Sequence, residues 1–205
     1  MPSSGERWGH YFLPEVGDQV LLAFDQGNIE KPYVIGCIPK DSNRFLTGSV
    51  DAENQYKKIM TKNGNAIIFE DNREGTGEND KIQITTPDMA HSITLDNQRK
   101  QIAIKDKDGK NQIVLKTEEG YMQVNAEKRL VINVGDTITV TMNGGNGTVT
   151  IECDKFNVKG GNGIIMESNA SAKLSGSNVT VEATSALRAN SNGTTTIQGT
   201  PIKIG

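Results

Sequence analysis

Residues 91–116 read HSITLDNQRKQIAIKDKDGKNQIVLK and hold the pattern that decides the fold. Apolar residues come here in pairs two positions apart, with polar residues between and around them: Ile93 and Leu95, Ile102 and Ile104, Ile113 and Leu115. A period of two sends successive side chains to opposite faces of a β-strand. Each segment is therefore predicted to be a short strand with one apolar face and one polar face.

The same pattern covers the chain from Lys81 to Gly205. Its other apolar members are Ile82, Ile84, Met122, Val124, Leu130, Ile132, Val134, Ile138, Val140, Met142, Val149, Ile151, Phe156, Val158, Ile164, Met166, Ala172, Leu174, Val179, Val181, Ala186, Leu187, Ile197, Ile202 and Ile204. The strand centres lie about nine to eleven residues apart at first and about seven or eight apart near the end. A short, regular step is typical of a solenoid, so the sequence predicts an all-β, β-helical fold for this part.

The chain has little apolar material for such a fold, with 35% hydrophobic and 5% aromatic residues. Ordering a residue costs about 1–2 kcal/mol of conformational entropy, whereas burying a Val, Leu or Ile side chain contributes about 1.5–3 kcal/mol. A single ribbon with one apolar face is therefore expected to be unstable alone. We predict an obligate homotrimer, the simplest closed prism, whose strands intertwine in a triangular β-helix.

The residues predicted to form the trimer core are the inward members of these strands. They are Ile93, Leu95, Ile102, Ile104, Ile113, Leu115, Leu130, Ile132, Ile138, Val140, Val149, Ile151, Val179 and Val181.

The first part of the chain has a different character. Strands are predicted on both sides of the turn at Asp25–Asn28, the second covering Pro32–Ile38, and together they make a β-hairpin. Their apolar runs are continuous, which predicts burial on both faces, as in a small barrel. A complete small barrel needs about five strands, so residues 1–38 are expected to form a partial OB-like barrel.

Two motifs in this hairpin carry a family resemblance. Residues 14–21 read PEVGDQVL and residues 27–36 read GNIEKPYVIG, and together they resemble the OB-fold end of the VgrG and phage baseplate central spike proteins. The segments TKNGNAIIFED at 61–71 and HSITLD at 91–96 resemble further segments of that family. Residues 199–204, GTPIKI, resemble the end of many such needles. The family's large N-terminal hub is absent from this chain.

Residues 39–58 are polar with few strand signals and are predicted to be a linker, and residues 59–80 are predicted to form a hairpin that enters the needle. The resemblance implies a collar at residues 1–38 and a β-helical needle at 81–205. It also implies a mechanical spike at the tip of a contractile injection system, such as a type VI secretion apparatus, a phage tail or a related particle. Baseplate or tube proteins would bind the N-terminal end. A PAAR-like tip protein would dock on the C-terminal residues Pro201, Ile202, Lys203, Ile204 and Gly205. The target cell envelope would be a transient partner.

Few residues offer catalytic or metal chemistry. The histidines, His10 and His91, stand apart from any cysteine or carboxylate cluster, and Cys37 and Cys153 lie in unlike contexts. Residues 106–109, DKDG, lack the further acidic positions of a calcium loop and are expected to form a turn. We therefore expect no enzymatic activity, no catalytic residues, no cofactor and no bound metal.

The formal net charge is −3 with both signs interspersed, so nucleic acid is not expected as a partner. No apolar run approaches the roughly 20 residues that span a membrane, and the N-terminus does not read as a secretory signal. Synthesis in the bacterial cytoplasm is expected, followed by assembly into the particle and delivery outside the cell on firing.

Two other functions fit parts of the pattern. A carbohydrate-binding or carbohydrate-degrading tail fibre or adhesin would also use a trimeric β-helix, but such proteins display aromatic platforms or paired carboxylates. Here the aromatic residues beyond Tyr56 are only Phe69, Tyr121 and Phe156. An OB-type nucleic-acid binder would need a basic stripe beside its aromatic residues, and none accompanies them.

Overall fold

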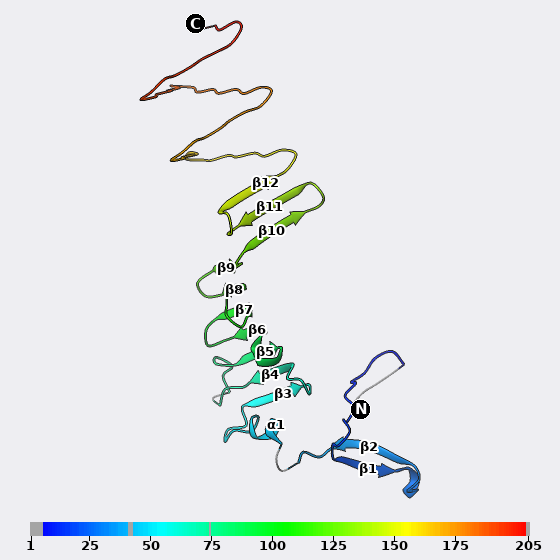
Figure 1. The fold of residues 1–205 in the computed structure, drawn as a ribbon. Helices are drawn as coiled ribbons and strands as arrows, with labels where there is room; N and C mark the ends of the chain where they lie inside the picture. The colour runs from blue at the N-terminus through cyan, green and yellow to red at the C-terminus, as the bar shows by residue number, and fades with distance from the viewer. Residues whose placement is uncertain (1–5, 41–42, 74, 204–205) are drawn as a thin grey trace. The chain divides into compact units, whose positions relative to one another are not determined.

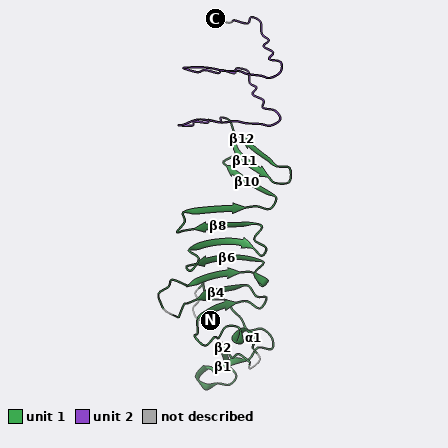
Figure 2. Ribbon diagram, turned by 90° about the vertical axis from the view of Figure 1, so that its left-hand side faces the viewer, with its two compact units in different colours: residues 1–154 green, residues 155–205 purple. Residues whose placement is uncertain are grey.

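The computed structural model of the chain describes residues 6–40, 43–73 and 75–203. These residues form an all-β protein with several antiparallel sheets, little helix and no closed barrel. The chain divides into two compact units, Met1–Asp154 and Lys155–Gly205, coloured separately in Figure 2. The predicted all-β class is confirmed to this extent.

The N-terminal hairpin forms where it was expected. Strand β1 (Val20–Phe24) pairs antiparallel with β2 (Pro32–Cys37), and a short 3-10 turn, η1 (Asp25–Gly27), begins the connection. The register shifts between Leu21 and Leu22. Every residue of β2 is exposed, so the prediction of burial on both faces is wrong within this chain. The reason is physical: two paired strands have no second layer to pack against.

The segment expected to be a linker carries some structure. Helix α1 (Arg44–Thr47) begins after Asn43, whose side-chain oxygen accepts hydrogen bonds from the backbone N–H groups of Phe45 (2.9 Å) and Leu46 (3.3 Å). Such side-chain capping satisfies N–H groups that have no partner within the helix. Strand β3 (Tyr56–Met60) also begins inside the 39–58 segment.

A seven-stranded antiparallel sheet follows, and each of its strands pairs with the next in the chain (Figure 1). Its strands are β3, β4 (Ala66–Glu70), β5 (Lys81–Thr85), β6 (His91–Asp96), β7 (Gln101–Asp106), β8 (Gln112–Lys116) and β9 (Tyr121–Asn125). A 3-10 turn, η2 (Pro87–Met89), connects β5 to β6. The segment predicted as a hairpin, 59–80, contains the end of β3, all of β4 and the loop that leads to β5.

Short turns join these strands, and glycine makes two of them possible. Gly109 and Gly120 adopt φ values of +68° and +61°, a region that side chains with a Cβ enter at a cost. The turns also bond across the sheet: the N–H of Thr117 donates to the carbonyl of Lys100 at 2.9 Å. The backbone hydrogen bonds between neighbouring strands therefore continue into the turns at the strand ends.

A second antiparallel sheet has three strands. It contains β10 (Arg129–Val134), β11 (Ile138–Asn143) and β12 (Thr148–Glu152), in that order. Ile132 lies opposite Val140, and Val140 lies opposite Ile151, so these side chains share one face. The predicted strands of this region are confirmed.

The second unit, Lys155–Gly205, contains no strand among its described residues, 155–203. Its trace runs back and forth in wide excursions (Figure 2), and the described side chains are exposed throughout. The strands expected between Phe156 and Ile202 are therefore not formed within this chain. A β-strand requires a hydrogen-bonded neighbour, and successive runs of this unit do not pair with one another.

The buried core of the described chain is small. Its buried hydrophobic residues are Ala66 and Ala103, at 5% and 4% exposure. Buried polar residues accompany them: Thr85, Ser92, Thr94 and Asp96. A folded single chain would bury its large apolar side chains, and this one leaves them at its surface.

Candidate functional site

The seven-stranded sheet has one face built almost entirely of large apolar side chains. The strand register arranges them in two rows that cross the sheet. One row contains Phe69, Ile82, Leu95, Ile102, Leu115 and Met122, and the other contains Ile59, Ile67, Ile84, Ile93, Ile104, Ile113 and Val124. These thirteen residues are called the apolar face below. Lys57 is the one position of the two rows that breaks the pattern.

The apolar face lies open in the single chain. Ile93 is 38% exposed, Ile104 is 47% exposed and Met122, on the last strand, is 63% exposed. A hollow follows the second row from Ile59 to Val124. Contiguous exposed apolar surfaces of this kind mark interfaces, because fully burying a Val, Leu or Ile side chain contributes about 1.5–3 kcal/mol.

The structure places six of the predicted core residues on the apolar face: Ile93, Leu95, Ile102, Ile104, Ile113 and Leu115. Six more share one face of the three-stranded sheet: Leu130, Ile132, Ile138, Val140, Val149 and Ile151. Val179 and Val181 lie in the second unit, 51% and 60% exposed. The assignment of these residues to a trimer core stays a prediction.

Seven residues of the apolar face were not among the predicted core. They are Ile59, Ile67, Phe69, Ile82, Ile84, Met122 and Val124. The period-two pattern already contains Ile82, Ile84, Met122 and Val124 and could have found them. The other three, Ile59, Ile67 and Phe69, are identified by the register, because each lies directly opposite a residue of the neighbouring strand or is continued by one in its row.

The predicted tip residues are only partly described. Pro201, Ile202 and Lys203 are exposed and lie outside any strand. Ile204 and Gly205 lie outside the described residues.

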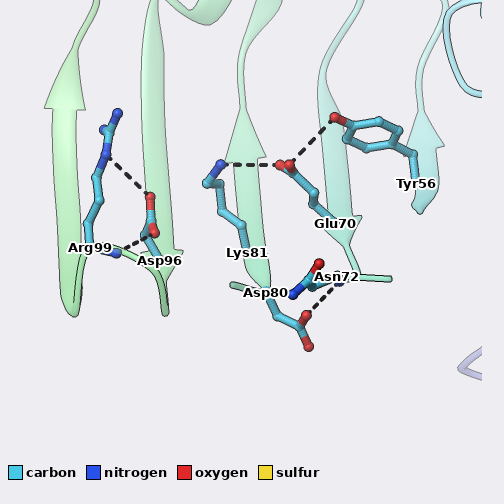
Figure 3. A network of polar contacts seen from close by, with 7 residues as sticks. All are labelled: Tyr56, Glu70, Asn72, Asp80, Lys81, Asp96 and Arg99. Carbon is cyan, nitrogen blue, oxygen red and sulfur yellow. Dashed lines mark hydrogen bonds and ion pairs between the residues drawn. The ribbon is translucent and has the colours of Figure 1, made fainter. Parts of the chain in front are cut away.

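The opposite face of the sheet carries charged and hydroxyl side chains (Figure 3). Lys81 Nζ lies 3.2 Å from Glu70 Oε2, and the Tyr56 hydroxyl lies 3.5 Å from Glu70 Oε1. Tyr56, Glu70 and Lys81 occupy directly opposed positions on β3, β4 and β5. Opposed charges of this kind contribute about 0.2–1 kcal/mol each, and they favour the observed register over a slipped one.

Asp96 continues this row on β6 and is almost fully covered. Its side chain is 2% exposed and accepts a hydrogen bond from the backbone N–H of Arg99 at 2.9 Å. The Arg99 guanidinium Nε lies 3.9 Å from the other carboxylate oxygen. The loop after β4 is fixed in a similar way, because the N–H of Asn72 donates to Asp80 Oδ1 at 2.7 Å (Figure 3).

Two titratable groups at one end of the strands have shifted pKa values. The pKa of Asp106 is lowered, first by the hydrogen bond that the side-chain amide of Asn111 donates to Oδ2 at 2.7 Å. The backbone N–H of Asn111 donates to the same oxygen at 3.1 Å. The pKa of Lys110 is raised by its hydrogen bond to Glu127 Oε1 at 2.7 Å.

The residues with catalytic or metal-binding chemistry do not come together in the described chain. No group of three or more histidine, cysteine, aspartate or glutamate side chains could hold a metal ion within residues 6–40, 43–73 and 75–203. Cys37 is exposed and Cys153 is half-buried, both as free thiols. Across those ranges, the helices are also too short and polar to span a bilayer.

A comparison with protein-family models gives a match over the hairpin region. Residues 1–38 match the Type VI secretion system/phage-baseplate injector OB domain. The injector OB domain match covers β1 and β2 and agrees with the resemblance carried by residues 14–36. It supports a relationship to baseplate spikes and a structural role in a phage or type VI injection apparatus. A search of curated proteins found no match to the chain.

Proposed function

We propose that this chain is the spike of a contractile injection system and acts mechanically as a homotrimer. The observation that carries the proposal is the apolar face, which crosses all seven strands of the sheet and lies open in the single chain. The injector OB domain match at residues 1–38 supports the type of particle.

Three copies can cover this face for one another. If three seven-stranded sheets turn their apolar faces toward a common axis, they form a triangular prism with a dry interior and a polar exterior. The row of Glu70, Lys81 and Asp96 then lies on the face of each sheet that is turned away from the axis. The apolar side of the three-stranded sheet would continue the same interior.

We infer that the second unit is intertwined with its counterparts in the other two copies. Its extended runs leave backbone N–H and C=O groups without partners in the described chain, and such groups are costly to bury unpaired. Strands from two further copies would supply those partners and would bury Val179 and Val181. A closed β-helix of this kind has no free sheet edges along its length.

The expected task is piercing rather than catalysis. The hairpin end would attach to baseplate or tube proteins, and the C-terminal end would carry a PAAR-like tip protein. We infer that the chain is made in the bacterial cytoplasm, assembled into the particle and driven through a target envelope when the sheath contracts. No enzyme activity, cofactor or nucleic-acid partner is part of the proposal.

Native mass spectrometry of the full chain tests the assembly, and we expect a single species with three times the chain mass. A folded, monodisperse monomer would overturn the proposal. The piercing role is tested in an injection particle built with an Ile104→Asp chain, which should contract normally yet fail to permeabilise target cells. Full permeabilisation by such particles would show that the spike is not the piercing element.

A further inference from the structure

The apolar face ends on both sides in polar residues at the strand termini. The line of strand ends on one side of the sheet is called the Asp106 edge. At strands β4 to β8 in turn it contains Asn65, Thr86, His91, Asp106 and Asn111. The line of strand ends on the other side is called the Lys100 edge. At the same strands it contains the flanking residues Asp71, Asp80, Asn97, Lys100 and Thr117. Backbone hydrogen bonds continue the register into both edges, with Asp106 N–H to the Asn111 carbonyl at 3.1 Å and Thr117 N–H to the Lys100 carbonyl at 2.9 Å.

Asp106 is an incompletely satisfied member of its edge. Its Oδ2 accepts two hydrogen bonds from Asn111, whereas its Oδ1 is buried and has no hydrogen-bond partner among the described residues. This carboxylate is charged at neutral pH, and its pKa lies below the ordinary value. A cation placed beside this carboxylate by another copy would stabilise its negative charge.

Lys100 is a matching donor on the opposite edge. It is exposed, and it forms no ion pair within the part of the chain that the structure describes. Lys100 and Asp106 occupy the two ends of the same strand, β7, and a strand rises about 3.4 Å per residue. They therefore lie roughly 20 Å apart in one copy and cannot pair with each other there. Lys110, on the hairpin turn beside Asp106, is already bonded to Glu127.

A three-fold ring brings these two edges together. In a closed cyclic trimer each copy meets its neighbours through two different surfaces, so the Asp106 edge of one sheet faces the Lys100 edge of the next at the same strand level. On β7 the acid faces the base. On β5 and β8 the facing residues are Thr86 with Asp80 and Asn111 with Thr117, which can hydrogen-bond. On β4 and β5 the acids Asp71 and Asp80 of one copy face the uncharged Asn65 and Thr86 of the next, so no acid faces another acid at these two levels.

We propose that Asp106 of one copy forms an ion pair with Lys100 of the next copy, three times in each trimer. This inference rests on the proposed trimer. It adds a contact between neighbouring copies that aligns β7 of one sheet with β7 of the next. The partner surface is a second copy of this chain. The Asp106 carboxylate supplies the acceptor and the Lys100 ammonium supplies the donor.

Charge reversal tests the pair. Lys100→Glu and Asp106→Lys each place like charges at all three corners, and each should lower the thermal midpoint of trimer dissociation followed by native mass spectrometry. The double variant restores an opposite-charge pair and should recover most of the loss. Lys107→Glu and Asp108→Lys, on the exposed turn between β7 and β8, form the matched control and should show no such recovery when combined.

The outcomes separate this inference from the proposed function. The ion pair is overturned, and the trimer is not, if the wild-type protein is trimeric but the double variant lowers the thermal midpoint by as much as the two single variants added together. A monomeric wild-type protein would overturn both.

Cross-linking gives a second measurement that does not depend on stability. In a chain with Cys37→Ser and Cys153→Ser, we expect Lys100→Cys combined with Asp106→Cys to yield covalent trimers with a short bis-maleimide. Either cysteine variant alone should give no covalent trimer. If the double cysteine variant is trimeric but its chains are not cross-linked, residues 100 and 106 of neighbouring copies do not lie side by side, and the proposed contact is wrong.

Discussion

Asp106 is the residue whose ionisation the structure ties most directly to stability. Its folded pKa lies below the ordinary value of 3.8, chiefly because the Asn111 side chain donates to it. A depressed folded pKa contributes stability above the unfolded pKa, and that contribution is lost as the pH falls through the folded pKa. The contribution is therefore present at neutral pH and disappears in acid, below about pH 4.

We expect Asn111→Ala to lower the thermal midpoint at pH 7 and to reduce the difference in midpoint between pH 7 and pH 3. The substitution removes the side-chain amide that favours the charged form of Asp106, whereas the backbone N–H remains. Thermal unfolding followed by circular dichroism across this pH range measures the effect. Asp108→Asn, on the same turn, serves as the control. An unchanged pH dependence for Asn111→Ala would show that this hydrogen bond does not affect stability.

At the scale of elements, strand β11 offers a direct test of which face is inward. Val140 and Thr141 are adjacent, both half-buried, and lie on opposite faces of the three-stranded sheet. We expect Val140→Asp to abolish trimer assembly, because three unpaired charges in a dry interior cost several kcal/mol each. Thr141→Asp should leave assembly intact. Size-exclusion chromatography with light scattering distinguishes the two, and equal behaviour of the variants would contradict the inward assignment of Val140.

The strands from Lys81 to Glu152 could be predicted because the apolar period of two is nearly unbroken there, as at Ile102 and Ile104. Strand β3 was missed because Tyr56, Lys57 and Lys58 show no such alternation; its register with β4 defines it. The pattern identifies an apolar side but not the partner that pairs with the strand. For this reason it predicted strands around Val179 that the single chain does not form.

The sequence predicted that the candidate site is an apolar face, but it did not predict which strands and residues that face includes. Alternation alone placed Ile93 and Leu95 on an apolar side. Cross-strand register was needed to show that Ile59 and Val124 extend the same rows over all seven strands. The two polar edges could not be found from the pattern, because residues as far apart as Asp71 and Thr117 align only once the strands are paired.

At the scale of the whole molecule, the proposed assembly couples folding to association. The buried hydrophobic core of the described chain consists of Ala66 and Ala103, so the free energy of folding must come mainly from contacts between copies. We therefore expect the thermal midpoint to rise with protein concentration, since mass action favours the associated state. Scanning calorimetry over about a hundredfold range of concentration measures the shift. A midpoint independent of concentration, with reversible unfolding, would indicate a chain that is stable alone.

The pairing of each strand with the next one in sequence also constrains how such a protein can change its length. Every strand reverses direction, so a single inserted strand would make every later strand start from the opposite edge of the sheet. A duplicated hairpin restores the original direction, so every later strand starts from the same edge as before. Changes of length in pairs of strands therefore preserve the direction of all later strands, and a needle of the proposed kind can be lengthened in steps of one hairpin.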